Sequence, residues 1–260
     1  METMEKNIID LAAWLESPVG RYVLDWEQAQ LARLTVDIFG YNALQIGMPQ
    51  IDGLAASRMP NRWLTDSAVH VHAGGTFKTP ERQVVVAHDF SELPFETQSI
   101  DLIILPHVLE FTDEPHQLLR EVERVLIPEG RVIITGFNQT SFWGARQLAG
   151  RMNDHYFLPQ EGEFISFTRM KDWLKLLSME IGEHRFGCYV PPCRSEKWLQ
   201  RFHFMEDAGK KWWPYFGAVY MVQAVKRVRG MHLIGPAWKQ KRLARGNAVA
   251  VANKVKTKQK

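Results

Sequence analysis

The segment from Ser99 to Phe137 constrains the fold more than any other part of the chain. Residues 99–105 form an almost continuous apolar run, residues 113–126 place apolar side chains at helical spacing, and residues 131–137 form a second apolar run. A strand, a helix and a strand in succession predict parallel neighbours joined by a crossover. Runs that are apolar throughout predict a sheet covered on both faces. We therefore expect an α/β fold with a mostly parallel sheet.

Similar patterns extend on both sides of this segment and predict the remaining elements. Helices are expected at Ile8–Leu15, Asp25–Phe39 and Thr168–Leu177, the last of them capped by Thr168, and strands at Ala43–Gly47, Ala68–His72, Val84–Ala87, Glu180–Phe186 and Gly217–Val228. This pattern divides the chain into N-terminal helices at residues 1–40, an α/β domain at residues 41–230 and a basic flexible tail at residues 231–260.

The charge of the chain is distributed unevenly along its length. Residues 208–260 hold 13 Lys and Arg and no acid, so 19 basic and 29 acidic side chains fall in residues 1–207. Clustered Lys and Arg neutralise phosphates, so the tail predicts nonspecific contact with nucleic acid, whereas solvated basic tails without such a role are common. Sequence-specific readout is not expected from so polar a segment.

Targeting signals and membrane segments are not expected. Acidic residues interrupt the apolar residues of the first 15 positions, and no apolar run approaches the ~20 residues that cross a bilayer. The two cysteines, Cys188 and Cys193, are too few for a disulfide scaffold or a four-cysteine zinc site. A soluble, cytoplasmic protein with reduced thiols and no metal site is the resulting expectation.

Ligands of open parallel sheets bind at the carboxyl ends of the strands. Gly47 follows the first expected strand, and a glycine there lets the backbone approach a ligand closely or simply turns the chain. Asp89 and Phe90 follow the third strand, and His107 follows the fourth. These positions are the candidate site residues.

The middle of the chain resembles the class I S-adenosylmethionine-dependent methyltransferases, and among them a small bacterial group of uncharacterised proteins. The resemblance spans roughly residues 40 to 190. It rests on segments whose order and spacing match the central block of that family: His88-Asp89-Phe90, Leu93-Pro94-Phe95, Ser99-Ile100-Asp101-Leu102-Ile103, His107-Val108-Leu109-Glu110-Phe111 and Leu126-Ile127-Pro128-Glu129-Gly130-Arg131.

The resemblance implies a seven-stranded, mostly parallel, Rossmann-like methyltransferase sheet with flanking helices, whose last strand runs antiparallel. It further implies that S-adenosylmethionine binds across the tips of strands one to four and donates a methyl group to an acceptor that the sequence does not identify. On this mapping Asp89 accepts a hydrogen bond from the adenine, with Phe90 nearby, and Gly47 lies against the methionine end. His107 also belongs to the cofactor site and, where a base is needed, is its candidate; alternatively it is a packed structural histidine.

Two features depart from the family pattern. Gln45 stands where the family has an acid, and Met48 and Pro49 replace part of the usual glycine-rich loop; proline has no N–H to offer a ligand. The strand expected at Ala68–His72 also ends without the acid that binds the ribose in the family; Val69-His70-Val71-His72 offers imidazoles instead. An alternative function therefore stays open: a degenerate, non-catalytic relative that serves as a binding or interaction module.

Two expected insertions are rich in aromatic residues. Residues 138–167 and 189–216 follow strands whose tips face the substrate side, so their rings either line an acceptor pocket or dock the insertions onto the core.

Overall fold

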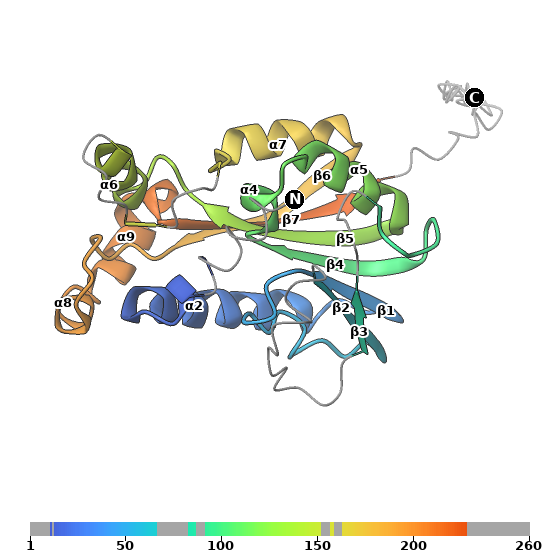
Figure 1. The fold of residues 1–260 in the computed structure, drawn as a ribbon, viewed down its shortest axis with the longest axis horizontal. Helices are drawn as coiled ribbons and strands as arrows, with labels where there is room; N and C mark the ends of the chain where they lie inside the picture. Colours follow the sequence, from blue (N-terminus) through green and yellow to red (C-terminus); the bar gives the residue numbers. More distant parts are fainter. Residues whose placement is uncertain are drawn as a thin grey trace, which may run out of the picture. The chain divides into compact units, whose positions relative to one another are not determined.

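The computed structural model describes residues 11, 13–66, 83–86, 92–151, 157–158 and 163–227, which belong to one compact unit. A seven-stranded sheet forms its centre, with α2 on one face and α5 and α7 on the other (Figure 1). The expected α/β fold is confirmed. Residues 231–260, the expected tail, lie outside the described residues.

The strands follow the order β3-β2-β1-β4-β5-β7-β6. The pairs β1–β2, β2–β3, β1–β4 and β4–β5 are parallel, and β7 is antiparallel to both β5 and β6. The antiparallel last strand is therefore confirmed. The bounds are β1 Asn42–Ile46, β2 Asn61–Asp66, β3 Gln83–Val86, β4 Ile100–Pro106, β5 Leu126–Phe137, β6 Met179–Gly187 and β7 Val219–Lys226.

Helices connect the strands and also build the insertions. Their bounds are α2 Pro18–Thr35, α4 Val108–Phe111, α5 Pro115–Val125, α6 Phe142–Arg151, α7 Phe167–Leu176, α8 Glu196–Arg201 and α9 Met205–Trp212, followed by the short 3₁₀ helix η1 Pro214–Phe216. Among the described residues, no helix combines the length and the apolar character needed to cross a bilayer.

Two expected helix starts were wrong, and the capping chemistry explains both. The second helix begins at Pro18 rather than Asp25, because the Ser17 hydroxyl accepts a hydrogen bond from Gly20 N–H and proline suits the first turn. In α7 the cap is Ser166, whose hydroxyl accepts from Arg169 N–H, and not Thr168.

The strand next to β1 differs from the expectation in a way that matters for function. The expected strand at residues 68–72 lies outside the described residues. The strand that pairs with β1 is residues 61–66, and it ends at Asp66. The prediction that the second strand ends without an acid was therefore wrong, because polar residues in Asn61–Asp66 hid a strand that apolar neighbours hold in the sheet.

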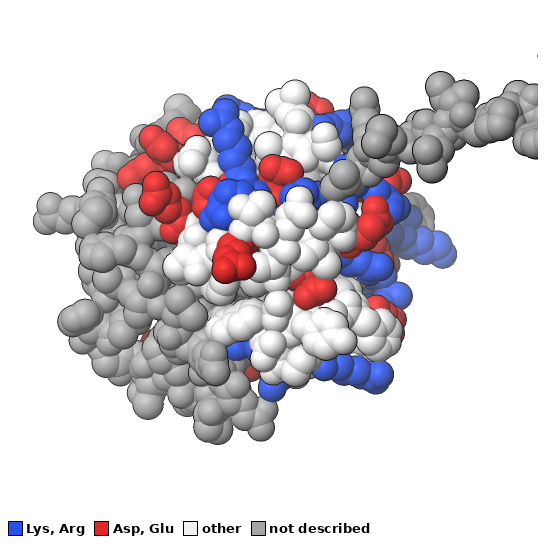
Figure 2. All heavy atoms as spheres, turned by 90° about the vertical axis from the view of Figure 1, so that its right-hand side faces the viewer, with Lys and Arg blue, Asp and Glu red and all other residues white. Residues whose placement is uncertain are grey.

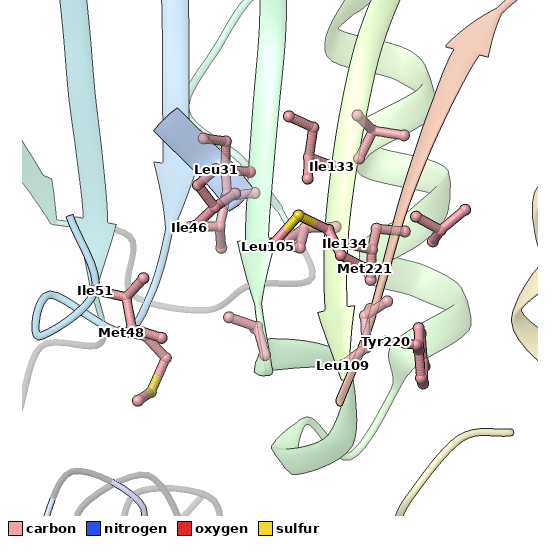
Figure 3. Close-up of a cluster of buried hydrophobic side chains, with 14 of the residues drawn as sticks. Leu31, Ile46, Met48, Ile51, Leu105, Leu109, Ile133, Ile134, Tyr220 and Met221 are labelled. Carbon is pink, nitrogen blue, oxygen red and sulfur yellow. The ribbon is translucent and has the colours of Figure 1, made fainter. Parts of the chain in front are cut away.

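The core lies on both faces of β4 and β5. Leu105 of β4 and Ile133 and Ile134 of β5 are fully buried and sit side by side in Figure 3. In the same picture, Leu31 of α2 lies beside Ile46 of β1. Burial on both faces explains why the central parts of these strands, residues 102–106 and 132–134, are apolar without alternation.

The insertions are docked by some of their aromatic residues and expose others. Trp143 of α6 is 1% exposed and donates its indole N–H to the Val190 carbonyl at 2.7 Å, whereas Trp212 of α9 is 74% exposed. Both cysteines are free thiols; Cys188 is buried and Cys193 is partly exposed.

Acidic and basic side chains intermingle on the face shown in Figure 2, which is the right-hand side of Figure 1. Among the described residues, Arg227 forms ion pairs with Glu180 and Glu129, and Arg124 forms one with Glu121. The described part of this face therefore presents both signs of charge together.

Candidate functional site

The carboxyl ends of β2, β1 and β4 lie beside one another at one edge of the sheet. Ile46 of β1 pairs with Thr65 of β2, and Gln45 of β1 pairs with Ile104 of β4. The carboxyl ends of β1, β2 and β4 therefore lie within one or two residues of one another. This register brings together Gly47 after β1, Asp66 at the end of β2 and His107 after β4. Asp89 and Phe90, the other two expected site residues, lie outside the described residues.

The loop after β1 begins with two residues in the left-handed region. Gly47 has φ 66° and Met48 has φ 50°, and the Gly47 N–H donates to the Thr65 carbonyl at 2.6 Å. Glycine adopts this conformation without steric cost. Because its N–H is engaged within the sheet, Gly47 can serve a ligand by its lack of a side chain rather than by a hydrogen bond.

The side-chain amide of Gln45 binds the backbone of this loop. It is fully buried, and its amide nitrogen lies 3.2 Å, 3.0 Å and 2.7 Å from the carbonyl oxygens of Gly47, Met48 and Ile51. Its side-chain oxygen accepts from Gly53 N–H at 3.0 Å. An ionised carboxylate accepts hydrogen bonds but cannot donate them. The exchange of the family acid for glutamine thus matches a loop that presents three carbonyl oxygens and one N–H group to the side chain, because an amide can both donate and accept.

The loop also fills its own interior. Met48 and Ile51 are buried just beyond the end of β1, where Figure 3 shows their side chains next to each other. Pro49 stands between them in the sequence and needs no N–H partner. The loop is therefore a compact, apolar turn in place of an extended glycine-rich one.

His107 ends β4 with a sharp change of direction. Its φ of 55° is left-handed, its N–H donates to the Thr135 carbonyl at 3.2 Å, and its ring centroid lies 4.3 Å from that of Phe137. The left-handed conformation is uncommon for histidine and costs energy. The surrounding contacts hold the residue in this conformation and keep its ring buried.

Two glutamates bind the two ring nitrogens of His107. Glu27 Oε1 lies 2.8 Å from Nε2, and Glu110 Oε2 lies 2.8 Å from Nδ1. The second oxygen of Glu110 accepts from Phe137 N–H at 2.6 Å. Glu27, His107 and Glu110, called the buried triad below, thus connect α2, β4, α4 and the end of β5.

The triad favours a protonated imidazole. Burial lowers the pKa of His107, but Glu27 and Glu110 outweigh burial and raise that pKa to about 10. Burial also raises the pKa of Glu110, although its bonds with His107 and Phe137 act in the opposite direction. His107 is therefore an imidazolium at neutral pH, held between two acids.

This geometry bears on the expected role of His107. The residue is 0% exposed and each ring nitrogen already faces a carboxylate, so neither nitrogen is free to take a proton from a substrate. The arrangement favours the alternative of a structural or positioning histidine. Among the described residues, no group of His, Cys, Asp or Glu side chains is arranged to hold a metal ion.

Glu27 was missed by sequence reasoning, although a signal was available. It lies four residues after Val23 and four before Leu31, and both of those are fully buried. An acid on the apolar stripe of a helix is buried with a partner or is functional. Asp66, the other residue missed, could have been found only by recognising residues 61–66 as a strand.

A cavity of about 280 Å³ lies beside the triad, between α4, the start of α5 and α7. Glu110 belongs to its lining together with Asp113, Glu163, Arg169 and Trp173. Because acids, a guanidinium and an aromatic ring line it, the cavity can accommodate a small polar molecule.

Comparison with known proteins agrees with this architecture. Residues 65–134 match the model of a methyltransferase domain. The chain is 32% identical over 176 residues, 68% of each protein, to the uncharacterized protein YafS of Escherichia coli. Its fold is similar to an S-adenosylmethionine-dependent methyltransferase of Thermotoga maritima, with a TM-score of 0.57, 14% identity and coverage of 80% of this chain and 91% of that one. A structure of the Haloferax volcanii complex of the Trm112 methyltransferase activator and a methyltransferase has the same TM-score at 15% identity, covering 85% and 97%.

Proposed function

The chain contains a methyltransferase domain and belongs to the same family as YafS, and from this premise we propose that it transfers a methyl group from S-adenosylmethionine to an acceptor. The observation that carries the proposal is the edge of the sheet where β1, β2 and β4 end together. Gly47, Asp66 and the buried triad meet this edge, which is where ligands bind in open parallel sheets.

The residues at this edge fit a nucleoside with a positive charge. Asp66 is the last residue of β2, and we assign it to the ribose hydroxyls because the resemblance implies a carboxylate at the end of the second strand. Gly47 adds no side chain that would block the methionine end, and the triad places an excess of acid at the end of β4. Asp89 and Phe90 are assigned to the adenine on the resemblance alone.

When bound, the cofactor supplies a methyl group that is already activated by its positive sulfur. The chain therefore needs to bind, orient and exclude water rather than to activate a leaving group, and orientation alone is worth up to ~7–11 kcal/mol in well-oriented systems. The structure offers such a site without a free base at His107, so we expect an acceptor that is already nucleophilic, such as a neutral amine or a thiolate.

Calorimetric titration of the full chain with S-adenosylmethionine tests the proposal. We expect saturable binding, an at least tenfold weaker affinity in Asp66→Asn and in Asp89→Asn, and an unchanged affinity in Asp172→Asn, which removes an exposed acid from α7. Absence of binding at millimolar cofactor would overturn the enzyme assignment and favour the non-catalytic alternative.

A further inference from the structure

The buried triad contains one more acid than base. Both ring nitrogens of His107 face a carboxylate, and both oxygens of Glu110 accept a hydrogen bond, one of them from Phe137 N–H. When His107 is the imidazolium, both of its ring nitrogens donate, so both oxygens of Glu110 then act as acceptors. One imidazolium between two carboxylates leaves an excess of one negative charge in the interior, where an uncompensated charge is costly.

The excess is located on Glu27. Its Oε1 binds His107, whereas its Oε2 is buried and has no hydrogen-bond partner among the described residues. Glu27 is 0% exposed, so solvent does not compensate this oxygen. A buried acceptor of this kind calls for a hydrogen-bond donor that the described residues do not supply.

A second buried oxygen without a partner among the residues that the structure describes, Thr135 Oγ1, lies on the same side of the sheet as the triad. Thr135 Oγ1 also lacks a hydrogen-bond partner in the described part of the chain. Thr135 is two residues before Phe137 on β5, and side chains two apart in a strand lie on the same face. The ring of Phe137 contacts His107, so the Thr135 hydroxyl faces the side of the sheet that carries the triad.

The negative field of the triad reaches neighbouring groups. Burial raises the pKa of the Cys188 thiol, and the charge of Glu27 raises it further, while Lys210 acts in the opposite direction. Burial likewise raises the pKa of the Tyr220 hydroxyl, with a further contribution from Glu110.

We propose that Glu27 is a specificity residue whose uncompensated buried carboxylate, at the edge of the sheet where β4 ends, makes the site prefer a positively charged ligand over an uncharged one. This inference rests on the proposed function. The cation is then the sulfonium of S-adenosylmethionine, and the disfavoured ligand is S-adenosylhomocysteine, the uncharged thioether that remains after methyl transfer. Such a preference would favour release of S-adenosylhomocysteine after methyl transfer and binding of the next S-adenosylmethionine.

The test compares two dissociation constants measured by calorimetry on the full chain, one for S-adenosylmethionine and one for S-adenosylhomocysteine. The wild type is expected to bind the sulfonium at least tenfold more tightly than the thioether. Glu27→Gln keeps an oxygen that can accept from His107 but removes the charge, so the ratio is expected to fall to about one through loss of sulfonium affinity. Asp25→Asn removes an exposed acid from the same helix and should leave the ratio unchanged.

Several results separate this inference from the proposed function. Equal affinities of the wild type for the two ligands would overturn the inference and leave the function standing, whether or not Glu27→Gln folds. An equal loss of affinity for both ligands in Glu27→Gln would assign Glu27 a purely structural role and also overturn it. Failure of the wild type to bind either ligand at millimolar concentration would overturn the proposed function itself.

Discussion

Nε2 of His107 lies 2.8 Å from Oε1 of Glu27, although 80 positions separate the two residues in the sequence. This bond joins the N-terminal helix α2 to the end of β4, across the face of the sheet that α2 covers. Neither residue is exposed to solvent. This buried contact therefore contributes both to the stability of the fold and to the electrostatics of the edge at which we propose the cofactor to bind.

The pH dependence of stability should report this contact. The pKa of His107 is about 10 in the folded protein against an ordinary value of 6.5, so folding favours the protonated ring. The resulting stabilisation is complete below about pH 6.5 and is lost as the pH rises towards 10. We expect the free energy of unfolding, measured with urea, to fall between pH 7 and pH 10 in the wild type.

His107→Gln should lose that part of the slope, and His184→Gln, at an exposed position of β6, should retain it. Identical slopes in the wild type and His107→Gln would contradict the assignment of the slope to the triad. Where His107→Gln does not fold, a wild-type free energy of unfolding that stays constant over this pH range would contradict it as well.

Restoring the family acid in the first loop should destabilise the protein. In Gln45→Glu a carboxylate would face the carbonyl oxygens of Gly47, Met48 and Ile51, none of which can donate a hydrogen bond. Loss of buried partners costs about 1–3 kcal/mol and more for a charged group, so we expect a loss of about 3 kcal/mol or more in chemical denaturation. Gln200→Glu on exposed α8 is the matched control, and a similar small effect of both changes would refute the argument.

A side chain at Gly47 should strain the backbone. Gly47→Ala forces a Cβ into a left-handed conformation, which costs about 1–2 kcal/mol. The midpoint of thermal unfolding should decrease accordingly. Gly182→Ala in β6 meets its nearest neighbour, the Gln223 carbonyl oxygen, at an ordinary 3.5 Å and should not lower the midpoint. Equal effects of the two alanines would show that the conformation of Gly47 imposes no strain.

The docking of the insertions should depend on one indole hydrogen bond. Trp143→Phe leaves the buried Val190 carbonyl without its donor and removes part of a ring that packs against Phe157 and Tyr22. We expect a loss of about 1–3 kcal/mol in the free energy of unfolding. Trp212→Phe, at an exposed ring, should cost less than about 0.5 kcal/mol; a comparable cost for both would argue against this docking contact.

The sequence predicted the elements whose signals are local and strong. The apolar runs that became β4 and β5, and the helical spacing that became α5, are readable because each segment repeats one pattern over its length. The prediction from sequence missed β2, because Trp63 and Leu64 stand among polar residues. It also placed the start of α2 too late, because the signal there is the pair Ser17-Pro18 rather than an apolar stripe.

Only some residues of the candidate site could be predicted from the sequence. Gly47 and His107 were identified by their place after apolar strands, and both do lie at the edge where β1 and β4 end. Asp66 was not identified because residues 61–66 were not recognised as a strand, and Glu27 was not identified because its place on an apolar helix stripe indicates burial but not its partner, the histidine 80 positions away.

By itself the sequence determined the class of the fold, because hydrophobic periodicity depends only on which face each residue presents to a neighbour. Tertiary structure alone decided that Gln45 binds the carbonyls of its own loop and that His107 is enclosed by Glu27 and Glu110. Such contacts join residues that differ in sequence position but share a buried volume, and in that volume the need to satisfy every charge and hydrogen bond assigns the partners.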